Sequence, residues 1–108
     1  MASGGETDES ALTRRSAENY LQFMGFSRQG LIDQLSSEYG DQFAVDDATV
    51  AVDSLWIDWN AQAVKSAKNY LEVMGFSCQG LIDQLSSEYG DQYTIEQATF
   101  GASQVGIC

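Results

Sequence analysis

The two cysteines, Cys78 and Cys108, are the side chains best suited to covalent chemistry in this chain of 108 residues. They do not form a Cys-X-X-Cys pair, which disfavours metal sites and thioredoxin-like redox sites. The chain has no histidine, which excludes imidazole as a metal ligand and as a general base. We therefore expect no metal, no cofactor and no catalytic residue.

Paired carboxylates are the other candidates for chemistry. Glu38 and Asp41 are close in sequence, and Glu88 and Asp91 repeat the same spacing. Two carboxylates can act as acid and base on a sugar, but nothing in so small a chain predicts the cleft that such a reaction needs. The spacing also lacks the successive oxygen ligands of a calcium loop. We interpret these acids as solvated loop residues, and the protein as a non-enzyme.

An internal repeat must position these side chains. The segment QGLIDQLSSEYGDQ occupies residues 29–42 and recurs unchanged at residues 79–92. The flanking sequence also matches, since SAENYLQFMGFSRQG at residues 16–30 is close to SAKNYLEVMGFSCQG at residues 66–80. A repeat of this period indicates that one copy is the folding unit.

The residue pattern of each copy predicts three short helices. In copy 1 the first helix has one apolar face, and Gly25 ends it at a position that favours a left-handed residue. Ser27 caps a second helix at about residues 28–38, and the third runs from about 45 to 54. The residues predicted to face inward are Ala17, Tyr20, Leu21 and Met24 in the first helix, and Leu31, Ile32, Leu35 and Tyr39 in the second.

The caps of the third helices differ between the copies. Thr94 and Gln97 have the spacing of a capping box, whereas Ala44 stands at the equivalent position of copy 1. We predict an all-α protein built from two tandem three-helix repeats that are helix-turn-helix-like. The predicted parts are a disordered leader at residues 1–7, repeat 1 at residues 8–55 and repeat 2 at residues 56–108.

The repeat also relates the two cysteines. Cys78 stands where copy 1 has Arg28, and Cys108 corresponds to Asp58. If the last two helices are antiparallel, the end of the chain returns to the start of the second helix of copy 2, within disulfide range. Our hypothesis is a disulfide between Cys78 and Cys108 where copy 1 has an Arg28–Asp58 ion pair; the alternative is two unrelated thiols. A disulfide would favour an extracellular location.

Charge argues against nucleic acid as the partner. The chain carries 16 acidic and 5 basic residues, for a net charge of −11. Binding to nucleic acid needs Lys and Arg to replace counterions on phosphate, so the helix-turn-helix shape alone does not predict a DNA-binding regulator. A basic protein surface would be attracted, although acidity can also serve only solubility.

The unchanged segment is the candidate partner-binding site. Core packing does not require the polar residues of this segment to match between copies. They nevertheless match, whereas neighbouring positions differ between the copies. Recent duplication is one explanation; our hypothesis is that each repeat presents the same polar face to a protein partner, with a gain in effective concentration. The predicted site residues are Gln29, Asp33, Ser37, Glu38, Gln79, Asp83, Ser87 and Glu88.

Trp56 and Trp59 flank the junction between the copies. An exposed tryptophan could anchor a partner. We favour the alternative, in which both rings pack and fix one repeat against the other.

The pattern NYL-x-x-x-GFS-x-x-GLI-x-QL, followed by an Ala-Thr pair, resembles the repeat of the host-cell-surface-exposed lipoprotein family, which includes superinfection-exclusion lipoproteins. The linker DWNAQAV at residues 58–64 is similar too, and the resemblance covers about residues 11–105. It implies a small helical domain outside a Gram-positive cell, tethered by a lipid on an N-terminal cysteine. It also implies, for some prophage-encoded members, superinfection exclusion through a phage injection component such as the tape measure protein.

We therefore expect an extracellular protein-binding module of a surface lipoprotein, encoded by a Gram-positive bacterium or its prophage, that blocks injection of phage DNA. The alternative is a structural module of the cell envelope without a phage role. No apolar run reaches the roughly 18 residues of a membrane-spanning helix, and residues 1–10 show no signal-peptide pattern. We expect membrane contact only through a lipid anchor that this sequence does not contain.

Overall fold

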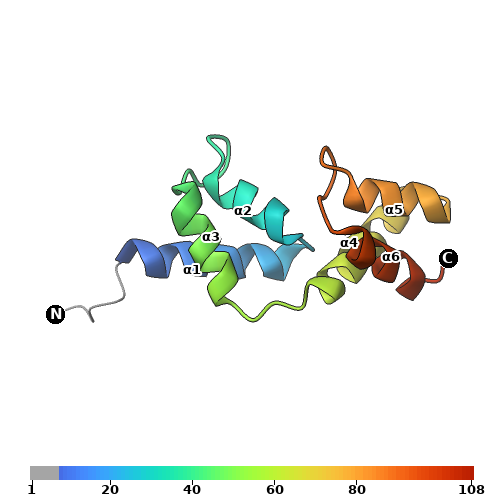
Figure 1. Cartoon of the computed structure of the whole chain (residues 1–108), viewed down its shortest axis with the longest axis horizontal. Helices are drawn as coiled ribbons and strands as arrows, with labels where there is room; N and C mark the ends of the chain where they lie inside the picture. Colours follow the sequence, from blue (N-terminus) through green and yellow to red (C-terminus); the bar gives the residue numbers. More distant parts are fainter. Residues whose placement is uncertain (1–7) are drawn as a thin grey trace. The chain divides into compact units, whose positions relative to one another are not determined.

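The computed structural model describes residues 8–108, so the predicted leader lies outside the described residues. Within 8–108 the fold is all-α and consists of two tandem three-helix repeats, as predicted (Figure 1). No helix in that range is long and apolar enough to cross a membrane. The helices are α1 (Asp8–Phe23), α2 (Arg28–Ser36), α3 (Val45–Ser54), α4 (Trp59–Val73), α5 (Cys78–Ser86) and α6 (Ile95–Gln104).

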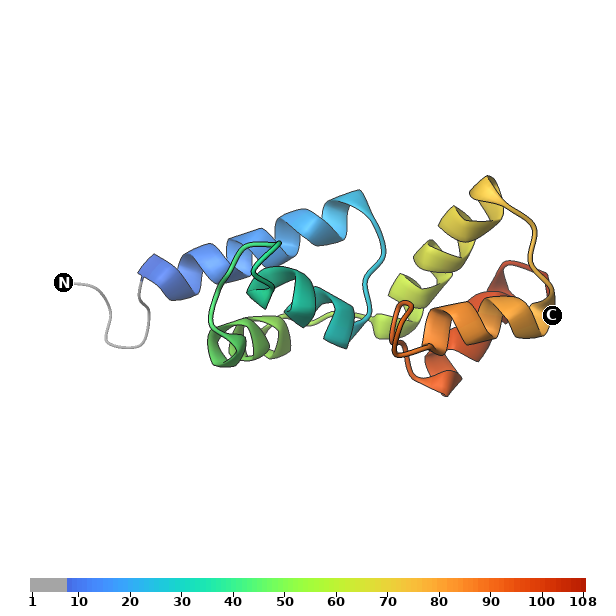
Figure 2. The same cartoon turned by 90° about the horizontal axis from the view of Figure 1, so that it is seen from above.

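The chain divides into two compact units. The first contains the described residues up to Phe23 together with Leu31–Ile57, and α1 packs against α3 in it. The second contains Met24–Gly30 together with Asp58–Cys108. In this unit α6 packs against both α4 and α5, as both cartoon views show (Figure 2).

Small side chains bring α4 and α6 close together. Ala63, Ala67, Ala98 and Ala102 are fully buried, with Leu81 and Leu85 of α5 completing the core. At Gly101 the approach is closest, because a Cβ placed there would lie 2.8 Å from the carbonyl oxygen of Ala63. The second unit therefore depends on a glycine where the first unit has the buried Ala51.

The helix caps largely follow the prediction. Ser27 accepts the Gly30 N–H at 2.9 Å, and Ser77 accepts the Gly80 N–H at the same distance. Thr94 and Gln97 form the predicted capping box, whereas Ala44 makes no side-chain cap. Each capped helix gains a partner for an N–H group that would otherwise have none within the helix.

Four local predictions are wrong. Helix α2 ends at Ser36 instead of near residue 38. Tyr39 is 91% exposed and Met24 is 48% exposed, although both were predicted to face inward. Gly25 ends no helix in a left-handed conformation, since Gly106 is the one glycine with positive φ among the described residues. The backbone after α4 is extended instead, with φ −158° at Met74, so the first turn of each repeat needs no glycine for its backbone angles.

Candidate functional site

The loop that follows α2 is held by its own backbone. The carbonyl of Ser37 accepts the N–H groups of Gly40 at 3.0 Å and Gln42 at 3.2 Å. The Phe43 N–H donates to the carbonyl of Leu35 at 2.8 Å, which turns the chain back toward α3. The same bonds recur in the second unit, where Ser87 accepts from Gly90 and Gln92. Each repeat thus carries one loop of defined shape, visible between α2 and α3 and between α5 and α6 (Figure 1).

Two positions of this loop have unusual backbone demands. Gln42 and Gln92 take positive φ, at 62° and 66°, a conformation that is uncommon for residues other than glycine. At Gly40 a Cβ would lie 2.1 Å from the carbonyl oxygen of Gln34, so no larger residue fits. The loop therefore requires its glycine for space and tolerates strain at the glutamine.

A tyrosine from the first helix of each repeat ties the loop down. In the first unit the Tyr20 hydroxyl donates to Asp41 Oδ1 at 2.9 Å and accepts from Gln34 Nε2 at 3.3 Å. In the second unit Tyr70, Asp91 and Gln84 form the same network, at 2.7 and 3.2 Å. The loop carboxylate is therefore a hydrogen-bond acceptor within the fold.

Burial changes the acidity of this network. Burial, together with the hydrogen bond to Asp91 that favours the protonated phenol, raises the pKa of Tyr70 to about 12. Burial also raises the pKa of Asp91, against the lowering effect of the Tyr70 hydrogen bond. The tyrosine proton thus stays in place at neutral pH and the hydroxyl remains a donor.

The tip of each loop exposes an aromatic ring. Tyr39 is 91% exposed and Tyr89 is 92% exposed, and within the described residues neither phenol makes a hydrogen bond. Both backbone N–H groups do, since each donates to the Ser hydroxyl two residues earlier at 3.0 Å. Sequence reasoning missed these tyrosines because the apolar spacing of α2 continues through the loop.

The predicted partner-binding residues divide into two groups. Gln29, Asp33 and Glu38 are exposed, as are their equivalents Gln79, Asp83 and Glu88. Within α5 the Gln79 amide donates to Asp83 at 2.8 Å. Ser37 and Ser87 are half-buried and hold the loop through their hydroxyl and carbonyl groups. The structure therefore gives the serines a role in the fold and leaves six of the eight side chains accessible.

A small hollow lies beside the loop in the first unit. It has a volume of about 260 Å³ and is lined by Ser16, Asn19, Tyr20, Phe23 and Asp41. The equivalent residues of the second unit also line a hollow, of about 360 Å³. Among the described residues, no group of three His, Cys, Asp or Glu is placed to hold a metal ion.

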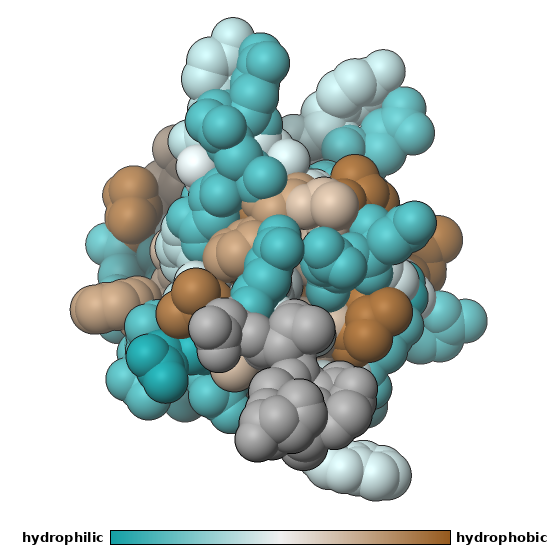
Figure 3. Space-filling view, turned by 90° about the vertical axis from the view of Figure 1, so that its left-hand side faces the viewer, coloured by the Kyte–Doolittle hydropathy of each residue, from teal (hydrophilic) through white to brown (hydrophobic). Residues whose placement is uncertain are grey.

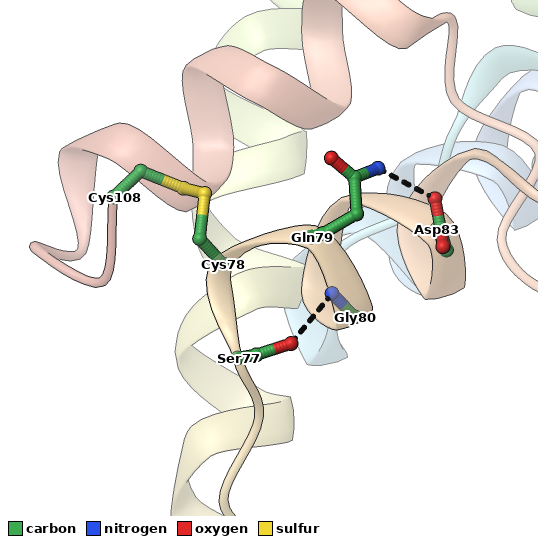
Figure 4. The surroundings of a disulfide bond; sticks show 6 residues. All are labelled: Ser77, Cys78, Gln79, Gly80, Asp83 and Cys108. Carbon is green, nitrogen blue, oxygen red and sulfur yellow. Dashed lines mark hydrogen bonds between the residues drawn. A yellow bond between two sulfur atoms is a disulfide. The ribbon is translucent and has the colours of Figure 1, made fainter.

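The two cysteines form the predicted disulfide. Their Cα atoms lie 5.0 Å apart, and Cys78 is the first residue of α5 while Cys108 ends the chain (Figure 4). The bond therefore ties the segment after α6 to the capped start of α5. Asp58, which is equivalent to Cys108, accepts the Ala61 N–H at 3.1 Å as the cap of α4. The Arg28–Asp58 ion pair stays a prediction.

The tryptophans do not behave alike. Trp56 is fully exposed, so the interpretation that both rings pack is wrong for this residue, while Trp59 at the start of α4 is half-buried. Exposed apolar side chains are otherwise interspersed with hydrophilic ones, as on the face drawn in Figure 3. Scattered apolar residues of this kind are ordinary on protein surfaces and mark no site by themselves.

Comparison with known proteins identifies the family. A solved structure of Ltp, a superinfection exclusion protein from the Streptococcus thermophilus temperate phage TP-J34, matches with a TM-score of 0.80 and 30% sequence identity. The match covers 91% of this chain and 96% of that one. No match was found among curated proteins. The model of the host cell surface-exposed lipoprotein family matches residues 6–55 and again residues 58–105, so the chain belongs to this family of surface lipoproteins.

Proposed function

We propose that the chain is a protein-binding module of a surface lipoprotein that acts in superinfection exclusion by stopping the injection of phage DNA. The observation that carries the proposal is the likeness to Ltp, which extends over 91% of this chain and includes both repeats. The proposed partner is a phage injection component, such as the tape measure protein. In this proposal a lipid anchor holds the protein on the surface of a Gram-positive cell.

The chemistry of the described surface supports a polypeptide partner. The net charge of −11 opposes approach to nucleic acid and to anionic lipid, and it favours a basic protein surface. Asp33 and Glu38 are exposed in the first unit, and Asp83 and Glu88 in the second. We propose binding without catalysis, since the acidic loop residue Asp41 is occupied in holding Tyr20.

Display on a cell tests the proposal. The chain is placed behind a lipoprotein signal sequence in a Gram-positive host, which is challenged with a panel of phages. We expect fewer plaques, normal adsorption and less injected phage DNA for at least one phage. Normal injection for every phage would favour the alternative of a structural cell-envelope module, and salt-dependent binding to duplex DNA in a gel shift would favour a regulator.

Paired charge reversals test the predicted face. Asp33→Lys with Asp83→Lys should weaken exclusion by removing two acids from equivalent exposed positions of α2 and α5. The matched control is Asp46→Lys with Glu96→Lys, which makes the same charge change at exposed positions of α3 and α6. If both double variants exclude phage equally well, the α2 and α5 face is not the partner-binding site, while the proposed role in superinfection exclusion is unaffected.

A further inference from the structure

We propose that Tyr39 and Tyr89 are the aromatic anchors through which the two repeats hold a polypeptide partner. Each ring enters an apolar pocket on the partner whose rim carries Lys or Arg. This inference deepens the proposed function, because it names the side chains that make the contact and the chemistry that receives them. Neither tyrosine is among the site residues predicted from the sequence.

The side chains of Tyr39 and Tyr89 are exposed and make no hydrogen bond within the described residues. A tyrosine ring gains free energy when it leaves water, yet these two rings are 91% and 92% exposed. Tyr20 and Tyr70, by contrast, hold the loop carboxylates, and Tyr93 is buried with its hydroxyl on Ser66 at 2.7 Å. The fold thus uses the other described tyrosines and leaves the two loop tyrosines unused.

The loop that carries each tyrosine is held in place by hydrogen bonds. The loop is fixed by backbone bonds to the Ser37 and Leu35 carbonyls and by the Tyr20–Asp41 bond. Affinity rises when a contact residue is already held in its bound position, because less freedom is lost on binding. Tyrosine adds large contact area with only two side-chain torsions to immobilise. A rigid loop with an exposed tyrosine at its tip is therefore well suited to bind.

The loop tyrosine is shared by the two copies. Of the exposed apolar pairs outside the loops, three have changed type between the copies and one, Met24 and Met74, has not, whereas the loop tyrosine is the same in both. Duplication alone would let an unused surface tyrosine drift as these positions have. The changed pairs are Phe23 and Val73, Val45 and Ile95, and Val50 and Phe100.

Charge decides the chemistry of the partner. Glu38 and Glu88 directly precede the tyrosines and are exposed, in a chain of net charge −11. A partner that receives the ring must also accommodate a carboxylate at its rim, which Lys or Arg does by ion pairing. Two such loops on one chain raise the effective concentration for a partner with repeated pockets.

A peptide library tests the inference directly. The full chain is immobilised and a library of random peptides of about 12 residues, displayed on filamentous phage, is selected against it. We expect enriched peptides with basic and apolar residues. Tyr39→Ala combined with Tyr89→Ala should weaken their binding by about 5-fold to 30-fold, which is more than most interface residues contribute. Phe at both positions should retain most of the affinity, since the ring is kept.

Trp56→Ala is the matched control, because it removes another fully exposed ring outside the loops. It should change binding by less than about twofold. Circular dichroism checks that all variants keep their helices, which we expect since both tyrosine side chains are exposed. No enriched peptide, binding insensitive to both tyrosines, or enrichment that depends equally on Trp56 would each overturn the inference.

The failure of this inference can be told from failure of the proposed function. If the displayed protein excludes a phage and the Tyr39→Ala, Tyr89→Ala double variant excludes it equally well, the tyrosines are not anchors, but the proposed role in exclusion holds. If the protein excludes no phage but binds peptides through its tyrosines, the tyrosines are anchors and the proposed role in exclusion is wrong.

Discussion

Removing the disulfide tests how the second unit is stabilised. Cys78 and Cys108 are separated by 30 residues, so their bond closes a loop that includes all of α5 and α6. Chain-entropy models give about 3.5 kcal/mol for a loop of this length. A unit of this size has a total stability of only about 3–8 kcal/mol, so Cys78→Ser with Cys108→Ser should remove about half of it or more.

The first repeat supplies a matched control. Cys78→Arg with Cys108→Asp installs the residues that copy 1 has at the equivalent positions. An exposed ion pair contributes at most about 1 kcal/mol, so this variant should recover only a small part of the loss. Reduction of the unaltered protein should reproduce the serine variant, while reductant should leave both variants unchanged.

Trp59 provides the assay, because it is half-buried at the start of α4 in the second unit. With Trp56→Phe in every protein, indole fluorescence during denaturation by urea reports on that unit. A difference of less than about 0.5 kcal/mol between the oxidised protein and the serine variant would refute the reasoning, since it would be far below the loop-closure value. Such a result would mean that packing of the segment after α6 stabilises the second unit equally well without the disulfide.

Three further predictions concern packing, pH and capping. Gly101→Ala should lose about 1–3 kcal/mol in urea denaturation because its Cβ meets the α4 backbone, whereas Gly75→Ala, with nothing within 4 Å, should not be destabilised. The pKa of Tyr70 in the folded protein is about 12, above the ordinary tyrosine value of 10.0, so stability that is complete below pH 10 should fall between pH 10 and 12. Tyr70→Phe should lessen that fall. Thr94→Ala should cost about 1 kcal/mol in thermal melts, whereas Ala44→Ser should be neutral or stabilising because that position makes no side-chain cap at present.

The sequence predicted well whatever local signals determine. Apolar spacing and capping residues gave the six helices, because the caps at Ser27, Ser77 and Thr94 act within one turn of each helix. The disulfide was predictable since the repeat itself provided the alignment of Cys78 and Cys108 with positions of the first copy.

The end of α2 was not predictable in the same way. Tyr39 continues the apolar spacing set by Leu35, and no glycine or proline stands between them to stop a helix. The helix ends at Ser36 because the chain turns to bond Phe43 to the Leu35 carbonyl and Asp41 to Tyr20, and both bonds join residues separated in sequence. Apolar spacing carries no information about such contacts. We therefore predicted that Tyr39 faces inward, although its side chain is exposed.

The structure also changes what the unchanged segment means. Gly40 is needed for space, Gln34 and Asp41 hold Tyr20, and Ser37 holds the loop backbone, so the fold alone accounts for these matches between copies. Tyr39 and its neighbour Glu38 have exposed side chains. If duplication were so recent that nothing had drifted, the exposed pairs elsewhere would match too, and several do not. The exposed side chains of the loop tip, together with Gln29 and Asp33 of α2, therefore remain the candidates for contact with a partner.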